Sequence, residues 1–417
     1  MVTYSRLMTL LLLALLCLPV AASEFPPGMQ PTIQQLDSTR IDLVEGAQPT
    51  GNWVIHFDPD TPPSEKLEYL QRIGADLDQD VVERIAQLDI WVVDASERFD
   101  SQFSQDVELL AGDFYFDSDV ALVEQDFLVS VAPVISEAPI GIADREVDFA
   151  IPPNDPDYDR QWALPHIQAE QAWREMGDLQ PMTVAVIDTG VCMTHEDLQG
   201  RVLSGGYDFV DNDDDPEDVF GHGCSVAGII AANTNNGIGI AGFANNSQIL
   251  PVRVLGPSGS GSMADVAAGI VYAADNDADI INLSLGSMVG SQVTKDAVEY
   301  AMGKGVTVIA SAGNSGGGLP GYPARYEGVV AVGAIDSDGK RSSFSNKGGD
   351  IWAPGRDVHT IYLDNGYKAL NGTSFSAPYV AAMAAVLQGM GERLHLDGGD
   401  MTWACMRNGA CEAVPGS

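Results

Sequence analysis

The sequence predicts an α/β fold: a doubly wound, mostly parallel sheet with helices on both faces, preceded by a small α+β domain. Two observations predict the sheet, namely continuous apolar runs and the helical stretches that alternate with them. The runs are MTVAVID, SQILPVRVL, ADIINLSLG, GVTVIASAGN and GVVAVGAI, and the helical stretches include SMADVAAGIVYAADN and SQVTKDAVEYAMGKG. A third observation is TSFSAPYVAAMAAVLQGM, which has too few charges for a surface helix and should be buried.

The chain is predicted to have five parts. A signal peptide (1–22) is indicated by an arginine, an apolar run too short for a membrane span, and small residues at its end. In 23–132, NWVIHF, LDIWVVDA and DVALVEQDFLVSV alternate like strands and PPSEKLEYLQRIG is typical of a helix. Residues 133–152 lack periodicity and are predicted to be a linker. The α/β domain covers 153–395, and 396–417 are expected to be a short appendage.

The composition and the signal peptide indicate which binding partners and which compartment to expect. The 417 residues are 45% hydrophobic and 19% charged, as in globular proteins. The net charge of −38 argues against nucleic acid and anionic membranes, and it is typical of bound cations or of salty surroundings. We expect a secreted protein, extracellular or periplasmic, with no membrane anchor. Four cysteines remain after the signal, and in an oxidising compartment they allow three pairings.

Four polar residues lie where functional groups of such a sheet collect, at the carboxyl ends of strands and at the starts of helices. Asp188 ends MTVAVID, Asn314 ends GVTVIASAGN, His222 opens a small-residue helix, and Ser374 begins the buried helix. Each one alone is equally typical of a helix cap or a turn. Together, Asp, His and Ser in this order match a known catalytic arrangement of serine hydrolases.

The surrounding motifs identify a family. VIDTGV, GHGxxVAG, SAGNSG and NGTSxSAP resemble the four signature blocks of the subtilisin-like serine proteases, over about residues 152–392 and nearest to the thermitase and proteinase K side. The resemblance implies a serine endopeptidase with a triad of Asp188, His222 and Ser374. Asn314 would donate to the oxyanion of the tetrahedral intermediate.

The resemblance also implies how a peptide is held. The segments 256–262 and 283–287 would bind it as an added β-strand, which leaves selectivity to side-chain pockets. The residues of these segments in contact with substrate would be Gly259, Ser260, Gly261, Ser284, Leu285 and Gly286. A primary pocket would be formed by Ala312, Gly313 and Gly321, and a second apolar pocket by Met263, Val266 and Leu285. Because Gly321 has no side chain, we expect a deep primary pocket and broad specificity with a preference for large apolar or aromatic residues.

Two further expectations follow from the family. The domain 23–132 resembles a propeptide that assists folding and blocks the cleft until the enzyme cuts it off between about Val131 and Pro153; an accessory domain that stays attached is the alternative. Calcium would be bound by Asp155, Asp197, the Asn236 side chain and the carbonyls of Asn233, Ile238 and Ile240. A second calcium site, or merely a solvated acidic loop, would contain Asp208, Asp211, Asp213, Asp215 and Glu217. We expect a monomer.

The chain departs from the family at three points, and these departures lead to a disulfide prediction. Cys224 and Ser225 replace the usual Thr and His, Phe375 replaces the usual Met, and Cys192 is rare in relatives. A triad needs the segments of Asp188 and His222 in contact, which brings Cys192 and Cys224 close together. We therefore expect Cys192–Cys224 and Cys405–Cys411 disulfides, with a buried free thiol at Cys224 as the alternative.

Two other functions share these motifs. An inactive peptide-binding module would keep the fold, but all four catalytic positions are intact. A peptide-ligating subtilase would need to exclude water, and no insertion near the cleft indicates this.

Overall fold

A seven-stranded sheet forms the centre of the larger domain. The computed structural model describes residues 48–72, 75, 80–94, 120–131, 152–176, 179–396, 398–409 and 411–415. The strands of the sheet run in the order β12-β11-β10-β9-β5-β7-β6, and every pairing between them is parallel. Their bounds are β5 Met182–Asp188, β6 Tyr207–Asp208, β7 Ser247–Arg253, β9 Ile280–Leu283, β10 Thr307–Ser311, β11 Val330–Ile335 and β12 Ile351–Pro354. The predicted doubly wound fold is confirmed.

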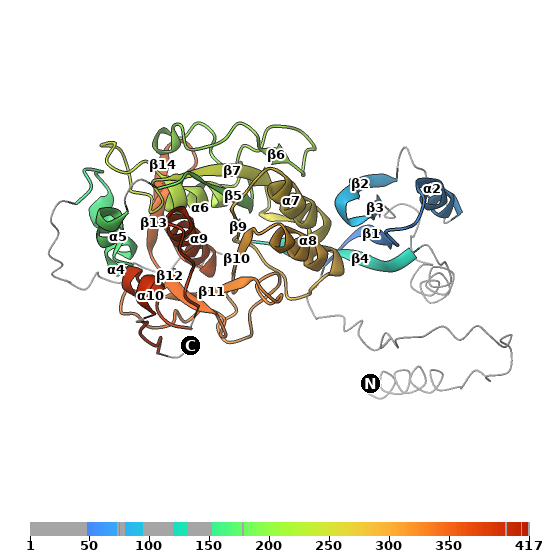
Figure 1. Cartoon of the computed structure of the whole chain (residues 1–417). Helices are drawn as coiled ribbons and strands as arrows, with labels where there is room; N and C mark the ends of the chain where they lie inside the picture. The colour runs from blue at the N-terminus through green and yellow to red at the C-terminus, as the bar shows by residue number, and fades with distance from the viewer. Residues whose placement is uncertain are drawn as a thin grey trace, which may run out of the picture. The chain divides into compact units, whose positions relative to one another are not determined.

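Helices cover both faces of this sheet (Figure 1). On one face, α6 (His222–Ala231) and α9 (Thr373–Gly389) share a core with Val184 and Val186 of β5. On the other face, α7 (Met263–Asp275) and α8 (Gln292–Gly303) share a core with Ala185 and Ile187. The alternation arises because successive side chains of a strand point to opposite faces. The expected buried helix is α9.

The strand order of the sheet reverses at β5, and this reversal determines where a site can form. β7 follows on one side of β5 and β9 on the other, so the strand order reverses at β5. In open parallel sheets, ligands bind outside the carboxyl ends of the strands at such a reversal. Asp188 is the last residue of β5 and lies at this point.

The N-terminal part is an antiparallel sheet packed on one helix, and its last strand also pairs with β8 (Ser260–Ser262) of the larger domain. Strands β1 (Pro49–Phe57), β2 (Val81–Ile85), β3 (Ile90–Asp94) and β4 (Val120–Ser130) run in the order β2-β3-β1-β4, with a short 3-10 helix, η2 (Ala86–Leu88), between β2 and β3. Helix α2 (Pro63–Arg72) contributes Tyr69 and Leu70 to a core with Ile55 and Phe57. The predicted strands and helix are present, whereas 1–22 and 133–151 lie outside the described residues.

The remaining elements are short. They are η3 Tyr158–Arg160, α4 Ala163–His166, α5 Ala169–Glu175, η4 Glu196–Leu198, β8 Ser260–Ser262, β13 Val358–Tyr362, β14 Gly366–Leu370 and α10 Trp403–Asn408. In the part of the chain that the structure describes, no helix combines the length and apolarity needed to cross a bilayer. The Tyr322–Pro323 peptide bond is cis.

The C-terminal segment belongs to the core, contrary to the expected appendage. Met401, Trp403, Cys405 and Met406 are buried in the cluster that contains α9. The Trp403 indole donates to Glu175 of α5 (2.8 Å), and its backbone N–H donates to the Ile167 carbonyl (3.0 Å). The expected Cys405–Cys411 disulfide is present, with Cα atoms 4.4 Å apart. This segment therefore attaches α10 to the first helices of the domain.

We predict that Trp403→Ala destabilises the domain. The side chain is 1% exposed, and removing a buried tryptophan costs about 3–5 kcal/mol. Leu396→Ala is the control, since Leu396 is 48% exposed and surface changes usually stay within about 0.5 kcal/mol. Calorimetry of both variants should show a lower melting temperature for Trp403→Ala only; equal melting temperatures would contradict the packing described.

Candidate active site

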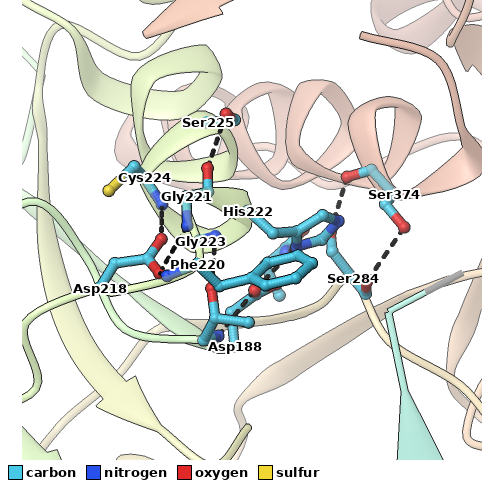
Figure 2. A network of polar contacts seen from close by, with 12 residues as sticks. Asp188, Asp218, Phe220, Gly221, His222, Gly223, Cys224, Ser225, Ser284 and Ser374 are labelled. Carbon is cyan, nitrogen blue, oxygen red and sulfur yellow. Dashed lines mark hydrogen bonds and ion pairs between the residues drawn. The ribbon is translucent and has the colours of Figure 1, made fainter. Parts of the chain in front are cut away.

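Three elements bring Asp188, His222 and Ser374 to one edge of the sheet (Figure 2). Asp188 ends β5, His222 is the first residue of α6, and Ser374 is the second residue of α9. Nδ1 of His222 donates to Oδ1 of Asp188 over 2.8 Å, and both side chains are buried. Oδ1 of Asp188 also accepts from the Thr189 N–H (2.7 Å), which orients the carboxylate toward the imidazole.

The third contact of the expected triad is not formed in this structure. The Ser374 hydroxyl donates to the Ser284 carbonyl (3.0 Å), and within the described chain Nε2 of His222 has no hydrogen-bond partner. A buried imidazole nitrogen without a partner is unusual and points to a functional role. Catalytic hydrogen bonds are often absent before substrate binds, so this arrangement is compatible with a base awaiting its proton. The ring of Phe375, which replaces the usual methionine, lies 5.3 Å from the His222 ring.

Close packing joins the segments of Asp188 and His222. The Gly223 N–H donates to the Thr189 hydroxyl (3.0 Å), and a Cβ atom at Gly223 would lie 1.9 Å from the Gly190 carbonyl oxygen. Only glycine allows this approach. The Cys192–Cys224 disulfide adds a covalent link, with Cα atoms 5.1 Å apart, so the expected pairing is confirmed and the free-thiol alternative is wrong.

Asp218 is a buried carboxylate that the motifs did not identify. Its Oδ1 accepts from the backbone N–H groups of Phe220 and Gly221 (both 2.8 Å), and its Oδ2 accepts from the Cys224 N–H (2.9 Å). The N-cap of α6, Gly221, offers no side-chain acceptor, so Asp218 caps the helix in its place. Burial raises the pKa of Asp218, and the Asp188 charge adds to this. The sequence signal that could have identified Asp218 is an Asp three residues before the glycine N-cap of the helix.

Asn314 presents a donor with no partner. Its side-chain oxygen accepts from the Thr373 N–H and hydroxyl (both 2.9 Å), which fixes the amide plane. Its Nδ2 is buried and makes no hydrogen bond to the described residues. A preorganised, unpaired N–H donor beside a nucleophile is what an oxyanion requires.

The two expected substrate segments hold a strand of the N-terminal domain. Leu128–Ser130 of β4 pairs with β8 in antiparallel register, Val129 facing Gly261 and Ser130 facing Ser260. On the other side, Ser130 and Gly286 exchange two backbone hydrogen bonds (2.9 and 3.3 Å). The N–H of Val131 donates to the Gly259 carbonyl (3.0 Å). Residues 128–131 therefore complete a sheet between the two segments.

Residues of the second expected pocket line one cavity. Val129 lines it together with Met263, Val266 and Leu285. At the primary pocket, the Gly321 N–H donates to the Ala312 carbonyl (3.0 Å), and Gly313 has a positive φ of 101°. A Cβ atom at Gly321 would lie 2.9 Å from the Ser287 carbonyl oxygen, so glycine is needed there.

The residues expected at the first calcium site surround one loop. Asp155 accepts from the N–H groups of Asn235 (2.9 Å) and Asn236 (3.0 Å), and Asp197 accepts from the Asn236 side chain (2.8 Å) and the Ile240 N–H (2.9 Å). Burial raises the pKa of Asp197 to about 6, with a contribution from the Asp155 charge. Two buried carboxylates facing the same loop fit a hard cation. Because no three His, Cys, Asp or Glu side chains of the described chain are grouped to hold a metal, the site would also need loop carbonyls, those of Asn233, Ile238 and Ile240.

The residues expected at the second calcium site have partners within the protein. Asp208 and Asp211 both pair with Arg253 of β7. Asp213 accepts from the Asp215 N–H (2.9 Å), and Glu217 accepts from the Met193 N–H (3.0 Å). The second calcium site stays a prediction.

The fold and the Asp–His pair with a serine at the sheet edge define a class, the α/β serine hydrolases. The sequence model described as the subtilase family matches residues 180–408, more than half of the chain, and the chain belongs to this family.

Named relatives and a solved structure agree with this assignment. Thermitase of Thermoactinomyces vulgaris is 47% identical over 242 residues, which cover 57% of this chain and 86% of thermitase. The thermophilic serine proteinase of Bacillus sp. (strain AK1) is also 47% identical over 242 residues, but the match covers only 60% of that protein. A solved structure of a protease from Pseudoalteromonas arctica is 33% identical, covers 57% of this chain and 86% of that chain, and has a TM-score of 0.53.

Proposed function

We propose that this protein is a secreted serine endopeptidase, made as a zymogen that cuts off its own N-terminal domain. The single observation that carries the proposal is the strand 128–131, which lies between β8 and the Ser284–Gly286 segment as an extended peptide substrate would. The Asp188–His222 pair and Ser374 lie next to the Ser284 end of this segment.

Each catalytic role follows from position and chemistry. Ser374 attacks the scissile carbonyl after His222 accepts its proton at Nε2, and the imidazolium then protonates the leaving amine. Asp188 holds Nδ1–H and stabilises the imidazolium. The tetrahedral oxyanion accepts from Nδ2 of Asn314 and from the Ser374 N–H, which lies in the first turn of α9 and has no acceptor within the helix.

The pockets give the specificity. Main-chain pairing with Gly259–Gly261 and Ser284–Gly286 accepts any extended peptide. The primary pocket of Ala312, Gly313 and Gly321 would prefer large apolar or aromatic residues. The pocket of Met263, Val266 and Leu285, which Val129 also lines, would take an apolar side chain.

Asp218 is proposed as a positioning residue. It holds the N–H groups on both sides of His222 and adds a negative charge behind the imidazolium. Calcium is proposed to stabilise the loop 233–240, held by Asp155, Asp197 and Asn236 together with loop carbonyls; it takes no part in bond cleavage.

We predict that Ser374→Ala abolishes hydrolysis and leaves the secreted chain uncut, because processing uses the same nucleophile. Ser376→Ala, two residues further along the same buried helix, is the control and should mature normally. Mass spectrometry of both secreted proteins makes the comparison. Maturation of purified Ser374→Ala alone would show that self-processing or the nucleophile is wrongly assigned.

We predict that Asp218→Asn lowers kcat about 10- to 100-fold while KM changes by less than about threefold. The amide cannot accept all three N–H groups, and the lost charge should move the acid limb of the pH–rate profile to lower pH, since the imidazolium is less stabilised. Val219→Ala, with Val219 exposed, is the control. An unshifted acid limb, or a change confined to KM, would reduce Asp218 to a structural role.

We predict that calcium raises the melting temperature of the folded protein. Ligand at about 100 times its Kd adds about 2.7 kcal/mol to the free energy of unfolding when it binds only the folded state. Asp197→Asn should weaken this effect, and Glu299→Gln, at an exposed carboxylate of α8 paired with Lys295, should not. Calorimetry with calcium and with chelator gives the comparison; identical curves would rule out the proposed site.

A further inference from the structure

The N-terminal domain contacts the subtilase domain through acidic side chains at two helix starts. Oδ1 of Asp126 accepts from the Ala264 N–H (3.2 Å) in the first turn of α7. Glu124 accepts from the N–H groups of Gln292 (2.8 Å) and Val293 (2.7 Å) at the start of α8. Both carboxylates come from β4, whose end lies in the cleft. Anions at helix N-termini are stabilising, so these contacts alone would favour docking of the ionised side chains.

Three carboxylates in the same interface are destabilised there when they are ionised. We call them the acidic cluster: Glu83 of β2, Asp126 of β4 and Asp265 of α7. Asp126 is 1% exposed, and one carboxylate oxygen of Glu83 is buried without a hydrogen-bond partner in the described structure. Among the described residues, no ion pair joins any of the three to a basic side chain. An ionised carboxylate is costly in such a place.

The pKa values of the cluster are all raised, mainly by burial. The pKa of Glu83 rises from 4.5 to about 8, with contributions from the charges of Asp265 and Asp126. That of Asp265 rises from 3.8 to about 7, with contributions from Asp126 and, on β6, Asp208. That of Asp126 rises from 3.8 to about 6, although Thr50 and the N–H groups of α7 act against the rise.

His56 of β1 adds a fourth titratable group to the interface. Its Nε2 lies 3.1 Å from Oε1 of Glu124, and its Nδ1 lies 3.5 Å from Oδ2 of Asp296 on α8. It is 6% exposed. Burial lowers its pKa, but the hydrogen bonds and charges of Asp296 and Glu124 outweigh this and raise it above 6.5. Protonated His56 therefore connects a carboxylate of each domain.

All four groups favour docking in the protonated form. A group whose pKa is higher in the docked state binds its proton more tightly there, so docking takes up protons. The contribution of the cluster is complete below the ordinary pKa values of 3.8 and 4.5 and is lost as the pH rises through about 6 to 8. The contribution of His56 is present below 6.5 and is lost at higher pH.

We propose that the acidic cluster and His56 form a pH-dependent latch, which holds the N-terminal domain on the subtilase domain in acid and releases it at neutral to alkaline pH. The proposal rests on the proposed function, in which this domain blocks the cleft. Activation would then consist of two events, the cut and a release that depends on pH.

The test uses the full chain carrying Ser374→Ala, so that no hydrolysis interferes. Hydrogen exchange of Ser130, Val131 and Gly286, corrected for the intrinsic effect of pH, reports docking because their N–H groups donate across the interface. We expect their protection to fall at least tenfold per pH unit between pH 6 and 8, because tenfold is the slope for one proton and more than one group titrates. Protection in the interior of β5 should stay constant.

Three variants identify the groups responsible. Glu83→Gln with Asp265→Asn removes two of the four titrating groups and should make the loss of protection between pH 6 and 8 at least tenfold smaller than in the parent. His56→Gln should weaken docking below pH 6 only. Glu299→Gln, an exposed carboxylate of α8 paired with Lys295, is the matched control and should behave like the parent.

The outcomes separate the latch from the proposed function. Constant protection from pH 5 to 9, or docking that tightens with rising pH, overturns the latch. An unchanged pH dependence in the Glu83→Gln/Asp265→Asn variant also overturns it, because other groups would then be responsible. The protease proposal is tested independently by the uncut Ser374→Ala chain.

Discussion

The hydrogen bond between Asp188 and His222 requires that the end of β5 and the start of α6 lie in contact. Several features of the chain meet this requirement. Gly223 permits the backbone approach, Thr189 accepts the N–H of the same residue, and the Cys192–Cys224 disulfide links the segments covalently. A displacement of either segment would separate the imidazole from its carboxylate. The strand order, which reverses at β5, leaves the space above this pair open to a substrate strand.

The acidic side chains of this protein have different roles, which depend on their burial and their hydrogen-bond partners. Asp218 is buried and bonded to three N–H groups, so it stabilises a helix start. Asp155 and Asp197 face one loop and fit a cation. Glu83 has a buried oxygen without a partner in the described chain, so its charge is unfavourable there. The acidic residues behind the net charge of −38 therefore do not act as a uniform surface charge. The effect of each one on stability depends on its burial and its partners.

Most of the fold and the central residues of the site could be predicted because their signals are local. Apolar runs gave the parallel strands, and four short motifs contain Asp188, His222, Asn314 and Ser374. The cysteine pair followed from the contact that a triad imposes. The pairing of Asp208 and Asp211 with Arg253 was not predicted, because Arg253 is distant in sequence and reaches them only through the neighbouring strand β7.

Other features depend on tertiary contacts that no local pattern reveals. Trp403 lies in a short segment near the end of the sequence, yet it packs in the main core because α10 meets α5. The acidic cluster joins β2, β4 and α7, so it is assembled from both domains. These features are governed by packing between segments far apart in the chain.

The central claim is that the strand 128–131 lies in the cleft of a protease that cuts the chain just beyond it. Intact mass and N-terminal sequencing of the protein recovered from culture medium test this claim most directly. The account predicts a mature chain that begins between residues 132 and 153 and contains both disulfides. A single chain that still includes β1 to β4, recovered together with full peptidase activity, would contradict it.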